Sequence, residues 1–166
     1  MNLLIDDFLG VLDGQAELYR SLLSVLYVEH GAIMESRLEK LNDANSEKVA
    51  LVLKIQNLED QRSEMLDRLA DSFGCPVQGL TLAKLAQFTE GPCSNRMKAF
   101  RVNLSSLIKR VREANDRNRS LLMHSIDLVK GSMTLLNNLI ASNAVYYRSG
   151  RIQNSDYNGR VFSGEI

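Results

Sequence analysis

The sequence predicts an all-α protein: an elongated antiparallel bundle of three long, coiled-coil-like helices with one short connector helix. Both prolines of the 166-residue chain, Pro76 and Pro92, lie close together, so the segments before and after them can form long helices. Apolar residues in both segments recur at steps of three and four, which is the spacing of an amphipathic helix. Aromatic residues make up only 6% of the chain and Trp is absent, which disfavours an aromatic-rich sandwich or barrel.

The first half of the chain is expected to form a helical hairpin. The first helix is placed over residues 2–42, because an apolar stripe continues through this range. The polar run at residues 42–46 predicts the turn, and the second helix then covers residues 46–73. Gly74 is expected to end it, since glycine readily takes the left-handed conformation that closes a helix.

The second half is expected to form one short and one long helix. Residues 81–88 predict the short helix, with Thr81 as its N-cap. After Pro92, a further apolar stripe predicts a long helix over residues 94–147 that folds back across the hairpin. Residues 148–166 are polar and interrupted by glycine, so a flexible C-terminal tail is expected there.

Length and composition indicate one helical domain over residues 1–147. The missing export signal and the two cysteines without CxxC spacing indicate a cytoplasmic protein. Acidic residues stand at positions 6–7, where a secretory signal would carry basic ones, and no apolar run is long enough to span a membrane. Membrane insertion is therefore not expected. Without an export signal, Cys75 and Cys93 are expected to be reduced thiols, although a bridge across the connector stays open.

Two asparagines interrupt the apolar stripe of the third long helix. Asn115 and Asn118 lie between Val111 and Leu121, where the spacing would place apolar residues. They belong either to exposed helix surface or to a polar layer that fixes the register of the helices, as a buried Asn does in coiled coils.

The balanced total charge conceals two halves of opposite sign. Residues 1–73 carry 14 acidic and 7 basic side chains, and residues 74–166 carry 6 acidic and 13 basic ones. The halves could neutralise each other across the bundle, or the charge could serve a partner. Nucleic-acid binding is not expected, because the basic cluster at residues 109–119 lacks interleaved aromatic residues and a docking motif.

Catalytic and metal-binding patterns are missing. The two histidines, His30 and His124, belong to no Glu-x-x-His motif and to no His–Cys cluster with zinc spacing. No glycine-rich loop follows a strand, and no nucleophile has an evident orienting base. The sequence therefore predicts a protein that is not an enzyme and holds neither metal nor cofactor.

The remaining signal is apolar surface between residues 121 and 140. This segment is too rich in Leu, Ile, Val and Met for a narrow two-position seam, and Met123 and Met133 could adapt to varied partner helices. It is either core of the bundle or a groove offered to another protein.

Several short patterns occur together along the chain in a characteristic order. They are Leu18-Tyr19 with Leu22-Leu23, Glu29-x-x-Ala32-Ile33, Leu58-Glu59-x-x-Arg62-x-x-Met65-Leu66, Leu80-Thr81-Leu82-Ala83-Lys84-Leu85, Asn115-x-x-Asn118-x-x-Leu121-Leu122 and Tyr146-Tyr147-Arg148-Ser149-Gly150. In this order and spacing, over about residues 3–150, the sequence resembles the flagellar export chaperones of the FlgN type.

The resemblance implies a cytoplasmic export chaperone of the flagellar type III secretion system. Such a chaperone binds the C-terminal amphipathic segment of hook–filament junction (hook-associated) proteins, prevents their premature assembly and delivers them to the export gate and ATPase complex. It leaves a homodimer open, and a non-secretory coiled-coil adaptor or scaffold is the alternative. The cargo-binding residues that it implies are Asn118, Leu121, Leu122, Ile126, Val129, Met133, Leu136 and Ile140.

Overall fold

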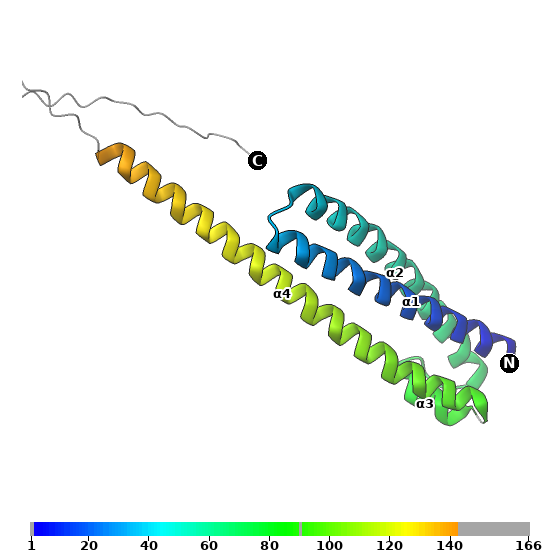
Figure 1. The fold of residues 1–166 in the computed structure, drawn as a ribbon. Helices are drawn as coiled ribbons and strands as arrows, with labels where there is room; N and C mark the ends of the chain where they lie inside the picture. Colours follow the sequence, from blue (N-terminus) through cyan, green and yellow to red (C-terminus); the bar gives the residue numbers. More distant parts are fainter. Residues whose placement is uncertain (1, 90, 143–166) are drawn as a thin grey trace, which may run out of the picture. The chain divides into compact units, whose positions relative to one another are not determined.

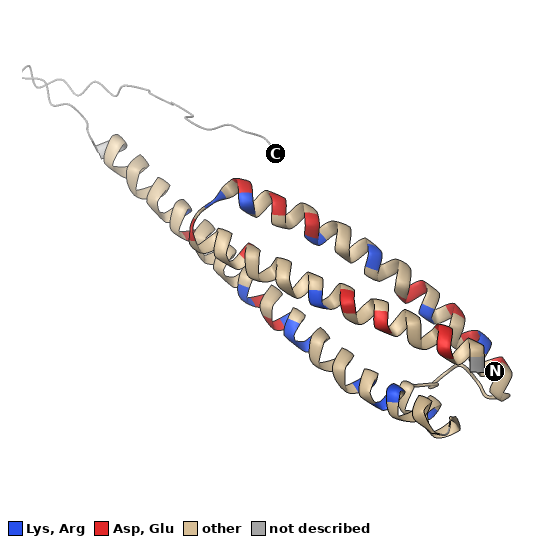
Figure 2. Ribbon diagram, turned by 45° about the vertical axis from the view of Figure 1, so that its right-hand side comes forward, with Lys and Arg blue, Asp and Glu red and all other residues tan. Residues whose placement is uncertain are grey.

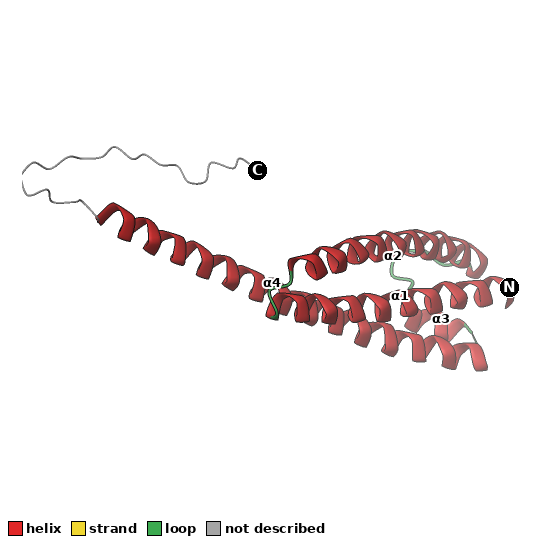
Figure 3. Cartoon of the chain, turned by 45° about the horizontal axis from the view of Figure 1, so that its top comes forward, coloured by secondary structure: helices red, strands yellow, loops and turns green. Residues whose placement is uncertain are grey.

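The computed structural model describes residues 2–89 and 91–142, and it shows an all-α helical bundle (Figures 1 and 3). The helices are α1 (Asn2–Met34), α2 (Leu38–Phe73), α3 (Leu82–Phe88) and α4 (Pro92–Ser142). No strand occurs among these residues, so the predicted fold class is confirmed.

The chain divides into two compact units, and the single domain over residues 1–147 stays a prediction. Unit 1 comprises Met1–Leu122 and unit 2 comprises Met123–Ile166. The predicted end of the last helix at residue 147 and the predicted tail at 148–166 lie outside the described residues.

The turn of the hairpin lies at residues 35–37, not at residues 42–46 as the sequence predicts. The N–H of Arg37 donates to the carbonyl of Ala32 at 2.9 Å, and Ser36 takes a left-handed φ of 54°. This is the motif that commonly closes a helix with glycine, so a serine there gives no sequence signal. The polar residues 42–46 are a regular part of α2, where Ala44 is buried and the Ser46 hydroxyl donates to the Asn42 carbonyl.

Glycine and threonine form the next two helix boundaries. Gly74 has a φ of 64°, and the Cys75 N–H donates to the Ala70 carbonyl, so α2 ends at Phe73. The Thr81 side chain accepts from the Lys84 N–H at 3.3 Å and caps α3. α4 begins at Pro92 itself, where the ring costs no hydrogen bond because the first N–H groups of a helix have no partner within it.

In unit 1, α1 lies between α2 and α4 (Figures 1 and 2). Its apolar residues enter two buried clusters, one with the end of α2, α3 and the start of α4, the other with the first half of α2 and with Ala114. Phe8, Leu9 and Leu12 are fully buried. Truncating such a side chain to Ala typically costs 2–5 kcal/mol, so α1 carries much of the stability of unit 1.

The two cysteines lie beside the first of these clusters. Cys75 and Cys93 are both free and half-buried, and both pack against its apolar residues. Each therefore contributes as a small apolar side chain.

The position of the turn can be tested with two serines. Ser36→Gly should raise the free energy of unfolding by about 0.5–1 kcal/mol, because glycine relieves the left-handed backbone. Ser46→Gly should lower it by about 0.5 kcal/mol, since it places glycine inside α2. Urea denaturation measures the free energy of unfolding of both variants. A destabilised Ser36→Gly variant together with a stabilised Ser46→Gly variant would indicate that the turn lies at residues 42–46.

Candidate functional site

One face of α4 packs against the hairpin in unit 1. Met97, Leu104, Leu107 and Ala114 on this face are buried at helical spacing. The ion pair of Arg96 with Asp6 near one end of α1, and the hydrogen bond of Asn118 to Leu26 near the other, show that α4 and α1 run parallel. In both pairs the α4 residue follows the α1 residue by a similar number of positions in the sequence. α1 and α4 therefore keep one register along their whole contact.

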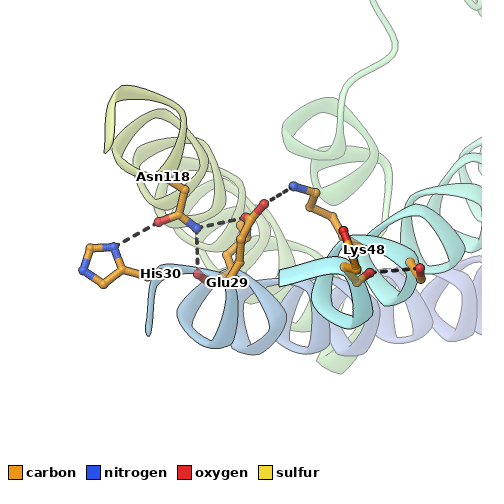
Figure 4. A network of polar contacts seen from close by, with 7 residues as sticks. Glu29, His30, Lys48 and Asn118 are labelled. Carbon is orange, nitrogen blue, oxygen red and sulfur yellow. Dashed lines mark hydrogen bonds and ion pairs between the residues drawn. The ribbon is translucent and has the colours of Figure 1, made fainter. Parts of the chain in front are cut away.

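A buried polar layer joins all three long helices of unit 1 (Figure 4). Asn118 on α4 is 2% exposed, and its Nδ2 donates to the Leu26 carbonyl at 2.8 Å and to Glu29 Oε2 at 2.9 Å. The other carboxylate oxygen of Glu29 pairs with Lys48 Nζ of α2 at 2.5 Å. His30 Nδ1 lies 3.0 Å from Asn118 Oδ1; because that oxygen can only accept, the imidazole donates.

Only one of the two asparagines that the sequence suggests for a register layer takes part in it. Asn118 is buried in the layer, whereas Asn115 is exposed, because Ala114 occupies the preceding buried position. The partners Glu29, His30 and Lys48 were not predicted from the sequence. A signal for Glu29 was present, since it follows Leu26 by three residues and precedes Ile33 by four, within the apolar stripe of α1.

The apolar stripe of α4 continues into unit 2, where its side chains are exposed. Ile126, Val129, Met133, Leu136 and Ile140 show exposed fractions from 40% to 70%. Leu121 and Leu122, at the end of unit 1, are half-buried. The cargo-binding candidates thus separate into five exposed residues, two half-buried residues and the buried Asn118.

A second row of apolar residues runs beside the first in unit 2. Leu128, Leu135 and Leu139 are 60–66% exposed, and the two rows together cover about half of the helix circumference at 100° a residue. The charged side chains of α4 beyond residue 122, Asp127 and Lys130, lie on the other half. We call the two rows from Ile126 to Ile140 the apolar face of unit 2. Continuous exposed apolar surfaces are in general typical of interaction sites.

Other kinds of site find little support in the described part of the chain. No three His, Cys, Asp or Glu side chains gather there in a way that could hold a metal ion. None of the helices described combines the length and the apolar content needed to cross a membrane.

A helical bundle with a long exposed apolar face on one helix belongs to the class of proteins that bind other proteins through helix packing. A family model described as FlgN protein matches residues 1–154, and the chain belongs to the FlgN family. This is a family of flagellar export chaperones that bind flagellar proteins, and it is not an enzyme family. Neither a curated protein nor a solved structure matches the chain significantly. The match of the FlgN family model confirms the family resemblance seen in the sequence.

The polar layer predicts unequal effects for the two asparagines. Asn118→Ala should lower the free energy of unfolding by about 2 kcal/mol, because it removes two donated hydrogen bonds and leaves the buried Glu29 carboxylate with fewer partners. Asn115→Ala should change it by less than about 0.5 kcal/mol, since Asn115 is exposed. Chemical denaturation compares the free energies of unfolding of the two variants. Equal losses would contradict the assignment of Asn118 to a buried polar layer.

Proposed function

We propose that this chain is a cytoplasmic export chaperone for hook–filament junction (hook-associated) proteins. The C-terminal amphipathic segment of the cargo binds the apolar face of unit 2, together with the half-buried Leu121 and Leu122. The chaperone prevents premature assembly of the cargo and delivers it to the flagellar type III export gate and ATPase complex. The observation that carries this proposal is the apolar face, whose side chains are 40–70% exposed. The membership of the chain in a family of export chaperones agrees with it.

The geometry of the face supports a helical cargo segment. Leu122, Ile126, Val129, Met133, Leu136 and Ile140 follow one another at steps of four and three. The row spans about 27 Å at 1.5 Å a residue, which matches a partner helix of about five turns. An amphipathic helix lays its own apolar residues into such a row at the same spacing.

The composition of the face also suits a chaperone that must release its cargo. The described part of unit 2 carries only Asp127 and Lys130 as charged residues, so apolar contacts would supply most of the affinity. Such contacts are non-directional and tolerate small shifts, and methionine side chains such as Met133 adapt readily to different partners. Covering the apolar face of a cargo helix would also keep it from self-assembly while it waits for export.

Substitutions at exposed residues of the apolar face test cargo binding without disturbing the fold. Val129→Asp and Leu136→Asp should each raise the Kd for a junction protein about thirtyfold, since a buried charge would replace an apolar anchor of about 2 kcal/mol. Both side chains are more than half exposed in the free chain, so the variants should keep their helical signal and melting curve.

Asn138→Asp is the matched control, because it adds the same charge on the polar side of the same helix. Isothermal titration calorimetry against the hook-associated proteins of the same organism measures all three variants. A junction protein that lacks its C-terminal segment should not bind. Unchanged affinity of the folded Val129 and Leu136 variants, or full binding of the truncated cargo, would reject the proposed site.

A further inference from the structure

A small hollow lies between α1 and α4 beside the polar layer of unit 1. Its volume is about 120 Å³, which leaves room for a few water molecules or one small polar group. It is lined by Leu26, Tyr27 and His30 of α1 and by Ala114, Arg117 and Asn118 of α4. All six residues belong to unit 1, so the hollow is separate from the apolar face of unit 2.

The hollow has an accessible rim and a buried floor. On the rim, Tyr27 is 50% exposed, Arg117 is exposed and His30 is half-buried. The other three lining residues are only 1–3% exposed and form the floor. A group that enters from solvent therefore meets a phenol, a guanidinium and an imidazole, all of which can form hydrogen bonds.

The polar layer holds the imidazole of the rim in place. His30 Nδ1 donates to Asn118 Oδ1 at 3.0 Å, and Asn118 is itself fixed by its hydrogen bonds to the Leu26 carbonyl and to Glu29. Figure 4 shows the other ring nitrogen, Nε2, turned away from Asn118. This nitrogen has no partner among the described residues, so its NMR signal can report a group that enters the hollow.

Arg117 supplies the charge of the hollow. A guanidinium stays charged in proteins and offers a planar fork of N–H donors that matches a carboxylate. Arg117 forms no hydrogen bond or ion pair with the residues that the structure describes, and no acidic side chain among them lines the hollow. The Glu29 carboxylate, which accepts from Asn118, is already paired with Lys48. The charge of Arg117 is thus available to an anion from outside the chain.

Direct pairing with the acidic hairpin does not neutralise the basic excess of α4. Figure 2 shows acidic residues along α1 and α2 and basic residues along α4 in unit 1. Within the described part of the chain, the ion pair between α4 and the hairpin is that of Arg96 with Asp6, at 3.9 Å. Of the two uses that the sequence leaves open for the divided charge, the unpaired Arg117 favours a partner.

We propose that the hollow binds one carboxylate group of the cargo, an inference that rests on the function proposed above. Arg117 would pair with the carboxylate, and the hydroxyl of Tyr27 would donate to it from the same rim. A carboxylate fits better than a phosphate, because a single guanidinium matches one negative charge. Phosphate sites commonly combine several arginines or use the N–H groups of a helix N-terminus.

The position of the hollow agrees with the proposed cargo site. Leu121 belongs to that site and follows Arg117 by four residues in α4, so the two are neighbours on one helix face, about 6 Å apart along the axis. A cargo segment that covers Leu121 would therefore bring a carboxylate within reach of Arg117. The carboxylate is either the C-terminus of the cargo or an acidic side chain near it.

Imidazole NMR on the full chain tests the hollow without any cargo. The chain has two histidines, so a His124→Gln variant assigns the His30 signals. Sodium acetate should shift the His30 Nε2 signal, whereas inorganic phosphate at the same pH and ionic strength should not. Arg117→Gln should abolish the acetate shift. Arg119→Gln is the matched control, since it makes the same change at an exposed position of α4 outside the hollow, and it should keep the shift.

Three results of this experiment would overturn the proposal. They are the absence of an acetate shift at His30, an equal shift with phosphate, and an acetate shift that persists in the Arg117→Gln variant.

Calorimetry with cargo peptides then identifies the source of the carboxylate. The peptides are the C-terminal segment of a hook-associated protein, the same segment amidated at its C-terminus, and the segment with Asn and Gln in place of its Asp and Glu. Arg117→Gln should weaken the unmodified peptide about fivefold, the effect of one ion pair at a partly exposed site, and Arg119→Gln should not. The peptide that lacks the bound carboxylate should bind both variants and the unaltered chain equally well.

An unchanged affinity of the Arg117→Gln variant for the unmodified peptide, or an equal loss with all three peptides, would overturn the cargo carboxylate as the ligand. Failure of the unmodified peptide to bind the unaltered chain would contradict the proposed function, and with it the cargo as the source. The acetate shift would still decide whether the hollow binds a carboxylate.

Discussion

The packing of unit 1 depends on one buried charge, the carboxylate of Glu29 on α1. This residue is only 3% exposed, and a buried carboxylate is strongly destabilising unless it is paired and hydrogen-bonded. One of its oxygens pairs with Lys48 of α2 and the other accepts a hydrogen bond from Asn118 of α4, so sliding either helix along α1 would remove one of these two partners. The apolar stripes of the three helices would tolerate several registers, but the polar layer selects one.

The fixed register aligns the first part of α4 with α1 in unit 1. α1 has 33 residues and α4 has 51, and the two run parallel from the pair of Asp6 with Arg96. Within unit 1, which ends at Leu122, Met97, Leu104, Leu107 and Ala114 of α4 are buried, whereas the residues of the apolar face of unit 2 are exposed. The change in side chains agrees: arginines and lysines flank the stripe before residue 120, whereas Ser, Thr and Asn accompany it afterwards.

Periodicity and proline positions were enough to predict the fold class, because an amphipathic helix has a spacing that no strand shares. The hairpin turn was missed because Ser36 adopts a conformation that glycine would have signalled. Residues 42–46 resemble a turn in composition, but Asp43, Asn45 and Ser46 lie on the exposed side of α2. Whether residues 121–140 are core or free surface could not be decided from spacing. The same spacing occurs on the buried part of α4 and on its exposed part. Asn118 could be singled out, but its burial depends on Glu29, 89 residues away in the sequence.

Hydrogen exchange on the isolated chain and on its complex with a junction protein tests most directly that α4 has one covered and one uncovered part. In the free chain, amides of residues 97–118 should exchange slowly, and those of residues 123–140 should exchange fast, because a helix without tertiary cover opens readily. Binding of the junction protein should slow the second group and leave the first nearly unchanged. Equal protection of both groups in the free monomer, or no added protection of residues 123–140 in the complex, would contradict the assignment of this helix segment as the binding surface.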